Sequence, residues 1–203
     1  MAKRRVLITC ADRYMGPAIQ KKFQNLEFDV TAGRSPMITE NQVVEAVDAA
    51  GHIDVLVANF AHPPVTGALE QLKSDDWMTL FDQLVHPLMY TVRATIPQML
   101  ERESGKIIAI TSAAPLKGIP NNSAYCAARG AQNSFIKAVG LELARSNIQV
   151  NAIAQNYIHN DTYYPDDLLK DEKFINHLNR NVPTRKIGSV SYTHLTLPTK
   201  PKV

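Results

Sequence analysis

Short apolar runs alternate with longer segments of helical periodicity along most of the chain. The apolar runs are rich in Val and Ile and nearly continuous, which is typical of strands covered on both faces of a parallel sheet. These runs predict strands at residues 5–10, 29–33, 53–59, 106–112 and 149–154. Apolar positions three and four residues apart predict helices at residues 16–26, 40–50, 74–84, 87–102 and 123–146. The alternation predicts an α/β fold with a doubly wound parallel sheet.

The last part of the chain departs from this alternation, which stops near Gly188. We therefore expect one domain over residues 1–188, with the C-terminal edge strand of its sheet missing. The remaining segment, residues 189–203, reads SVSYTHLTLPTKPKV and predicts neither a helix nor a buried strand. Two interpretations of it stay open: a disordered native tail, or an artefact, because the string resembles translated adapter sequence.

The composition limits the cellular compartments and the classes of partner that this protein is expected to have. A chain of 203 residues with 45% hydrophobic residues is long enough for one sizeable core. A net charge of +3 with scattered basic residues does not favour a nucleic-acid partner, and no apolar run is long enough for a membrane span. Two cysteines without a disulfide framework are typical of the cytoplasm. The six histidines lie in no metal-binding motif, so the sequence predicts no metal site.

An open parallel sheet binds its ligands beyond the carboxyl ends of its strands. The segments at these ends are residues 9–16, 33–36, 59–64, 112–115 and 155–165. The first reads TCADRYMG, and Gly16 is its only glycine, whereas a phosphate-binding loop uses several glycines to bring its backbone close to the ligand. The interval between residues 33 and 53 holds one helix and two turns, so any wall for an adenine ring would be thin.

Three polar residues at these strand ends carry the strongest chemical signal. Ser112 ends a buried strand, and Tyr125 and Arg129 follow near the start of the next helix. Tyr125 and Arg129 are four residues apart, so they lie on one face of that helix. A guanidinium beside a phenol favours the phenolate, which could take a proton from an alcohol whose oxygen Ser112 holds. We expect these three side chains to form a catalytic group.

With these residues the chain resembles the short-chain dehydrogenase/reductase superfamily, whose pattern is a serine followed by Y-x-x-x-K. The resemblance extends over about residues 4–188 and includes LVANFA at residues 56–61 and VNAIAQN at residues 150–156. It implies a Rossmann-like catalytic domain. The chain departs from the pattern where the family contacts its cofactor: Arg129 replaces the lysine, Cys10 and Tyr14 replace the first two loop glycines, and Gln155-Asn156 replaces a Pro-Gly pair.

These departures together resemble the halohydrin dehalogenases, a subgroup that uses Ser-Tyr-Arg and binds no nicotinamide cofactor. HIDVLVANFA, VHPL and IAQNYIHN are similar to that subgroup. The resemblance implies that Tyr125 deprotonates a vicinal halo-alcohol held by Ser112, and that the oxygen then expels the neighbouring halide to form an epoxide. The reverse opening of an epoxide by a small anion is implied as well. No cofactor is expected.

The same resemblance predicts where the halide and the substrate bind. A halide needs a semi-polar nest of backbone N–H groups and aromatic edges. The resemblance places this nest between the first turn and Asn156-Tyr157-Ile158, with Tyr14 and Tyr164 as walls. Phe60 is a candidate wall of the substrate site, although a phenylalanine at a strand end is equally compatible with the core. A homotetramer or homodimer is implied, built on the helices predicted at residues 87–102 and 123–146.

The sequence also leaves two other functions open. An NADP-dependent reductase is the first alternative, because Arg34 follows the second strand, where a 2′-phosphate would be bound. Tyr14, Arg129 and the thin adenine wall argue against it. The second alternative is a truncated and inactive member of the fold, because a sheet without its edge strand could leave the site open.

Overall fold

The core of the protein is a five-stranded parallel sheet with the strand order β2-β1-β3-β4-β5. The computed structural model describes residues 3–160 and 163–189. All five strands that the sequence predicts are present: β1 (Arg5–Ile8), β2 (Asp29–Ala32), β3 (Val55–Ala58), β4 (Gly105–Ser112) and β5 (Ile148–Gln155). The order reverses between β1 and β3, which places a ligand crevice at their carboxyl ends. The predicted doubly wound α/β fold is confirmed.

The predicted helices are present as well. They are α1 (Gly16–Asn25), α2 (Glu40–Ala50), α3 (Ser74–Leu84), α4 (His86–Glu101) and α6 (Ser123–Leu143). The last of these is shorter than the predicted helix over residues 123–146, because Ala144–Ser146 forms a 3₁₀ turn before the left-handed residue Asn147. The short helix α5 (Ala114–Lys117), which follows β4, was not predicted, since four residues carry too little periodicity.

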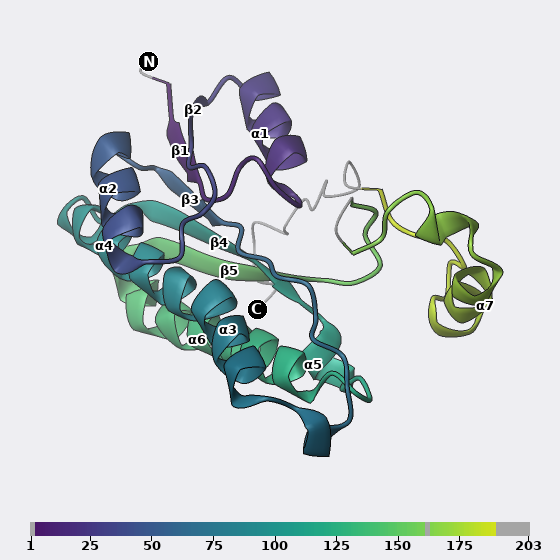
Figure 1. The fold of residues 1–203 in the computed structure, drawn as a ribbon. Coiled ribbons are helices and arrows are strands. Elements are labelled where there is room, and N and C mark those ends of the chain that lie inside the picture. Colours follow the sequence, from purple (N-terminus) through teal and green to yellow (C-terminus); the bar gives the residue numbers. More distant parts are fainter. Residues whose placement is uncertain (1–2, 161–162, 190–203) are drawn as a thin grey trace. The chain divides into compact units, whose positions relative to one another are not determined.

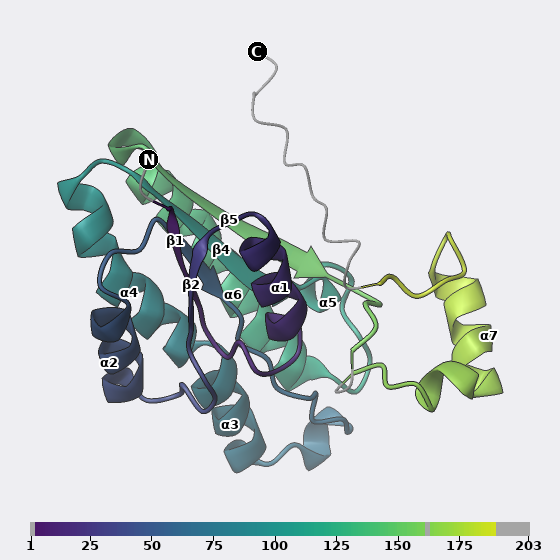
Figure 2. The same ribbon diagram turned by 90° about the horizontal axis from the view of Figure 1, so that it is seen from above.

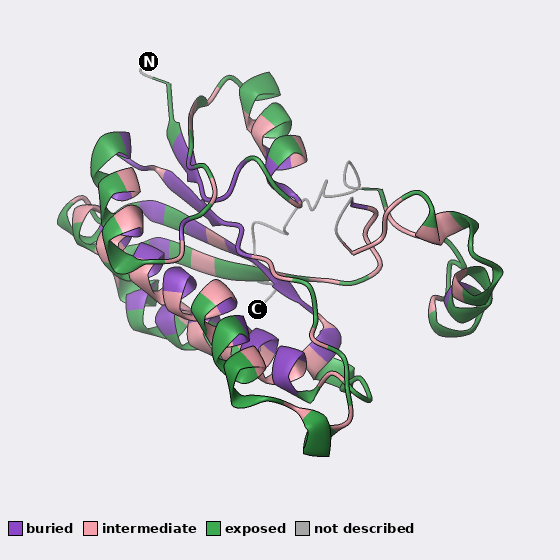
Figure 3. Ribbon diagram, viewed as in Figure 1, coloured by how far each residue is buried: buried purple, intermediate pink, exposed green. Residues whose placement is uncertain are grey.

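The helices lie on both faces of the sheet (Figures 1 and 2). Helix α1 covers one face, and α2, α3, α4 and α6 lie on the other. The central strands carry the core: Leu7, Leu56 and Ile107 are each 0% exposed (Figure 3). Burial of each such side chain contributes about 1.5–3 kcal/mol. Among the described residues β5 pairs on one side only, and it forms the half-exposed edge of the sheet.

The contacts divide the chain into two compact units, Met1–Asn156 and Tyr157–Val203. This division falls inside the domain predicted over residues 1–188, because the segment after β5 packs on its own aromatic side chains. The second unit contains α7 (Glu172–Asn181), which begins where the Asp171 carboxylate accepts hydrogen bonds from the N–H groups of Lys173 and Phe174. The N-cap Asp171 and the apolar spacing after it were the signals in the sequence for this unpredicted helix. The tail predicted at residues 189–203 lies, apart from Ser189, outside the described residues.

Two features of the described part of the chain concern a membrane and a metal ion as partners. No helix there is both long and apolar enough to cross a membrane. No group of three or more His, Cys, Asp or Glu side chains there is placed to hold a metal ion.

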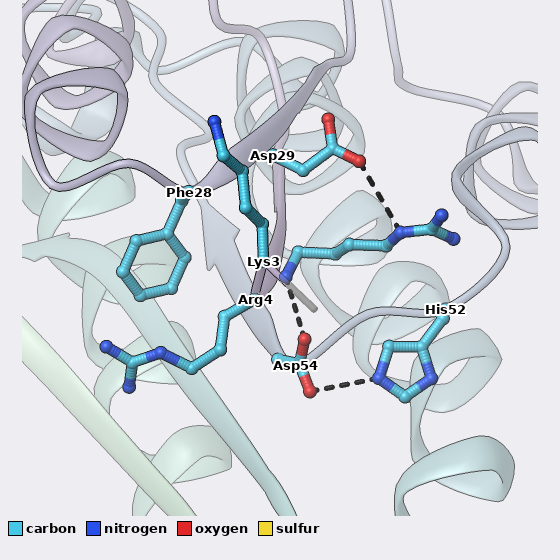
Figure 4. A pocket seen from close by; sticks show the side chains of 7 residues that line it. Lys3, Arg4, Phe28, Asp29, His52 and Asp54 are labelled. Carbon is cyan, nitrogen blue, oxygen red and sulfur yellow. Dashed lines mark hydrogen bonds and ion pairs between the residues drawn. The ribbon is translucent and has the colours of Figure 1, made fainter. Parts of the chain in front are cut away.

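A charged pocket of about 660 Å³ opens at the amino ends of β1, β2 and β3, the edge opposite to the ligand crevice (Figure 4). There Asp54 accepts a hydrogen bond of 2.7 Å from the Arg5 N–H and one of 2.9 Å from His52 Nε2. Burial alone would raise the pKa of the Asp54 carboxyl. The hydrogen bonds from Arg5 and His52 and the charges of His52 and Arg102 outweigh this effect, so the pKa lies below its usual value.

Because the folded-state pKa of Asp54 is depressed, its stabilising contribution is complete above the unfolded-state value of about 3.9 and is lost as the pH falls through the folded-state pKa. We expect Asp54→Asn to lower the free energy of unfolding by about 1 kcal/mol at pH 6, and by progressively less as the pH falls below about 3.9. Urea unfolding across this pH range measures the difference. The control is Asp29→Asn, which removes only an exposed ion pair and should cost less. A constant difference for Asp54→Asn over the whole range would contradict the prediction.

Candidate active site

Ser112 lies at the carboxyl end of β4 and is 9% exposed. Its hydroxyl Oγ accepts a hydrogen bond of 3.1 Å from the Ala114 N–H, the first residue of α5. Its carbonyl accepts one of 3.0 Å from the Asn133 side-chain amide, which lies on α6. The strand end that carries Ser112 is therefore fixed to the helix that carries Tyr125 and Arg129.

Tyr125 and Arg129 meet on α6, as their spacing of four residues predicts. Arg129 Nε donates a hydrogen bond of 3.1 Å to the Tyr125 hydroxyl, and the guanidinium carbon lies 5.3 Å from the centre of the Tyr125 ring. Tyr125 is 8% exposed and Arg129 only 1%. The two side chains are therefore held together by a hydrogen bond and a ring contact in a place that water hardly reaches.

The other side of the guanidinium is held by two further groups. Arg129 Nη1 donates hydrogen bonds of 3.0 Å to the Phe60 carbonyl and 2.8 Å to Gln132 Oε1. The Phe60 ring itself is 2% exposed and belongs to the hydrophobic core, so this residue reaches the site through its carbonyl. Gln132 and Asn133 were not predicted as site residues. Their signal was a pair of amides on the helix of Tyr125 and Arg129, one turn after the arginine.

The loop after β1 keeps the backbone path of a glycine loop although two of its residues are not glycine. Cys10 has φ = 46° and Tyr14 has φ = 53°, both in the left-handed region that favours glycine. Gly16 retains its glycine for a steric reason, because a Cβ there would lie 2.6 Å from backbone atoms of Cys10 and Ala11. Asn59 fixes the loop, donating hydrogen bonds of 3.0 Å and 3.1 Å to the carbonyls of Cys10 and Arg13.

The residues of this loop differ from those of a dinucleotide-binding loop. The glycines of a phosphate loop let the backbone approach the pyrophosphate, and here Cys10 and Tyr14 stand at two of the glycine positions. In addition, Asp12 Oδ1 accepts hydrogen bonds of 2.9 Å and 3.0 Å from the N–H and hydroxyl of Ser35, which joins the loops after β1 and β2. Burial opposes the ionisation of Asp12, but the hydrogen bonds from Ser35 outweigh it and lower the pKa. A carboxylate between these loops repels the phosphates of an adenosine cofactor.

Tyr14 is half-buried, and its hydroxyl lies within electrostatic range of the Tyr125–Arg129 pair. Burial raises the pKa of the Tyr14 hydroxyl, while the positive charges of Arg13 and Arg129 act in the opposite direction. The ring thus stands beside the candidate catalytic group, within the first unit. This position is compatible with the predicted wall of a halide nest.

The remaining predicted halide residues follow β5. Asn156 ends the first unit, whereas Tyr157, Ile158 and Tyr164 belong to the second. Within the second unit, Tyr157 and Tyr164 have ring centroids 5.8 Å apart, and the Tyr157 hydroxyl is hydrogen-bonded to His177 at 2.8 Å. Tyr157 has φ = 49°, and burial raises the pKa of its hydroxyl. The residues predicted for the halide nest are thus divided between the two units, and the nest stays a prediction.

A family model described as short chain dehydrogenase matches residues 5–168. The chain belongs to the short-chain dehydrogenase family. Among curated relatives, the human 3-oxoacyl-[acyl-carrier-protein] reductase is 30% identical over 149 residues, which are 73% of this chain and 60% of the reductase. The chain spans 43–60% of the length of the first curated relatives that it matches.

Solved structures of this family include different chemistries. A protein described as a dehalogenation enzyme is 26% identical, with a TM-score of 0.78 over 94% of this chain and 87% of its own. A halohydrin dehalogenase bound to ethyl (2S)-oxiran-2-ylacetate has a TM-score of 0.85 over 93% of this chain and 86% of its own. At 22% identity, the second likeness shows the fold alone. Because the curated relative above is a reductase, the fold does not choose between the two chemistries, and the residues of the site must do so.

Proposed function

We propose that this member of the short-chain dehydrogenase family is a halohydrin dehalogenase, a lyase that converts vicinal halo-alcohols to epoxides and halide without a cofactor. The observation that carries the proposal is the loop after β1, in which Cys10 and Tyr14 take glycine-type backbone angles but carry side chains where a phosphate loop has glycines. Such a loop is poorly suited to the close approach of a pyrophosphate, and Tyr14 lies within electrostatic range of Tyr125 and Arg129.

The proposed reaction needs only groups of this chain. The Tyr125 phenolate, stabilised by Arg129, takes the proton of the substrate hydroxyl, whose oxygen accepts a hydrogen bond from Ser112. The alkoxide attacks the neighbouring carbon from behind, so a C–O bond forms as the carbon–halogen bond breaks and the halide leaves with the electron pair. Both reacting atoms belong to one molecule, so the protein supplies orientation and charge stabilisation. In the reverse direction, a small anion opens the epoxide and Tyr125 returns the proton.

Arg129 supports this assignment through its burial. Its guanidinium is 1% exposed and donates hydrogen bonds to the Tyr125 hydroxyl and to oxygens of Phe60 and Gln132, so it is held against the phenol that the proposal assigns as the base. The likeness to the solved dehalogenation enzyme at 26% identity is compatible with the same chemistry. The halide nest of Tyr14, Asn156, Tyr157, Ile158 and Tyr164, the homotetramer or homodimer and the cytoplasmic location remain parts of the proposal.

An NADP-dependent reductase is the second candidate, and one observation favours it: the human relative at 30% identity is a reductase. Arg34, exposed directly after β2, would then bind the 2′-phosphate. The Asp12 carboxylate argues against this candidate, because it is hydrogen-bonded to Ser35, the residue next to Arg34.

The two candidates make opposite predictions for one preparation of the protein. We expect chloride release from a chlorinated vicinal alcohol such as 1,3-dichloro-2-propanol, and no change in NADPH fluorescence when NADPH is titrated to about 100 μM, because typical cofactor affinities lie below that concentration. An ion-selective electrode and a fluorimeter measure the two responses. Saturable fluorescence enhancement without chloride release would favour the reductase. Failure of both responses would favour an inactive member of the family.

A further inference from the structure

Gln132 is a buried amide that connects the candidate catalytic arginine to a neighbouring helix. It lies three residues after Arg129 on α6 and is 1% exposed. Its Oε1 accepts the hydrogen bond of 2.8 Å from Arg129 Nη1, and its Nε2 donates one of 2.6 Å to the carbonyl of Leu84, the last residue of α3. Both ends of the amide are therefore used, and the chain of contacts runs from α3 through Gln132 to the guanidinium.

The rigidity of the guanidinium makes this contact matter for Tyr125. Its donors lie in one plane, so a group that holds Nη1 also sets the direction of Nε. Nη1 is held from two sides, by Gln132 Oε1 and by the Phe60 carbonyl, while Nε donates to the Tyr125 hydroxyl. Without Gln132 the guanidinium loses an anchor at Nη1, so its plane is less firmly directed at the phenol.

The residue type also points to a role beyond packing. A buried amide stabilises a fold only where its donor and acceptor are both satisfied, and an apolar residue of similar volume avoids that requirement. The same face of α6 carries the apolar residue Ile136 one turn further on, at 2% exposure. The amide at position 132 is therefore explained by its polar partners. The partner that belongs to the candidate active site is Arg129.

We propose that Gln132 is a positioning residue, which holds the Arg129 guanidinium in the plane that directs Nε at the Tyr125 hydroxyl. This inference rests on the proposed function, in which that contact stabilises the phenolate. Gln132 does not touch the substrate, so its replacement should lower kcat and leave KM nearly unchanged.

A double-mutant cycle on halide release tests the proposal. We expect Gln132→Met to lower kcat about tenfold to a hundredfold, the range for a lost hydrogen bond to a charged group, with KM within about twofold. In an Arg129→Lys background the same change should alter kcat less than about twofold, because an ammonium has no planar fork to orient. An equal loss in both backgrounds, or an unchanged kcat in Gln132→Met, would overturn the proposal. If Gln132→Met does not fold, Gln132→Leu, which also removes the acceptor oxygen, enters the same cycle.

A structural control separates positioning from general destabilisation. Ile136→Val removes one buried methylene from the same helix, so it should lower Tm and leave kcat within about twofold. A loss of kcat in Ile136→Val as large as that in Gln132→Met would show that the loss follows stability, and would count against the positioning role.

A second measurement does not need halide release, so it distinguishes failure of this inference from failure of the proposed function. In ¹⁵N-labelled protein the Arg129 Nε–H signal is assigned by its absence from Arg129→Lys. We expect its exchange with water to become at least about tenfold faster in Gln132→Met, because the contact that buries it loosens. The Nε–H of Arg102, at the end of α4, serves as the internal reference and should not change. An unchanged Arg129 exchange rate would overturn the positioning role even if the wild-type protein releases halide.

Discussion

Tyr125→Phe should abolish halide release, lowering kcat/KM by about a thousandfold or more. The variant keeps the ring and its packing but removes the oxygen that accepts the proton, and general-base catalysis contributes about 10²–10⁴-fold. The effect is expected at the upper end because the proposed base is preoriented: Arg129 Nε lies 3.1 Å from the hydroxyl. Initial rates of halide release with a halo-alcohol at several concentrations measure the loss.

Two controls make this result interpretable. The variant leaves Arg129 Nε without its phenol oxygen, which destabilises the fold by about 1–3 kcal/mol, so the folded fraction must be measured by circular dichroism at the assay temperature. Tyr90→Phe on α4 is the matched control, because Tyr90 is partly buried and packs with Arg93 away from Ser112 and Arg129. It should retain wild-type activity. Substantial halide release by folded Tyr125→Phe would exclude the proposed mechanism.

Gly16→Ala should strongly lower the free energy of unfolding, although it adds only one methyl group to the loop after β1. A Cβ at position 16 would lie 2.6 Å from the carbonyl carbon and oxygen of Ala11 and from the carbonyl oxygen of Cys10. These are backbone atoms, so no side chain can rotate to make room. We expect a loss of about 3 kcal/mol in the free energy of unfolding, measured as a lower urea midpoint.

Gly67→Ala is the matched control for that experiment. A Cβ at position 67 would have no heavy atom within 4 Å, so the change should be within about 0.5 kcal/mol of neutral. Equal urea midpoints for Gly16→Ala and wild type would mean that the loop does not follow the described path. The Gly16→Ala protein should also lose activity, because the same loop carries Tyr14.

The alternation of apolar runs with segments of helical periodicity was sufficient to predict the sheet. Strands buried on both faces must be almost entirely apolar, and a helix between two parallel strands must be amphipathic, so sequence and fold are tightly coupled there. The spacing of Tyr125 and Arg129 was equally sufficient for their contact, because residues four apart on one helix are neighbours whatever surrounds them. Helix α7 carried its signal in Asp171 and in the apolar residues after it, but it lies beyond the alternation of strands and helices that predicted the other elements.

Contacts between distant segments could not be predicted in the same way. That Asn59 fixes the loop after β1, that Asp12 reaches Ser35, and that the Phe60 carbonyl rather than its ring reaches Arg129 all depend on which strand ends become neighbours. Side-chain direction at a strand end depends on a twist and a turn that local sequence does not specify.

The sequence by itself therefore determined the order of elements, the family resemblance and the identity of the polar residues at the strand ends. Only the tertiary structure decided how those residues are oriented. It gave Cys10 and Tyr14 left-handed angles, buried the Arg129 charge, and placed Gln132 between that charge and α3. The physical reason is that hydrophobic periodicity is a property of one segment, whereas the satisfaction of buried polar groups is a property of all the segments that surround them.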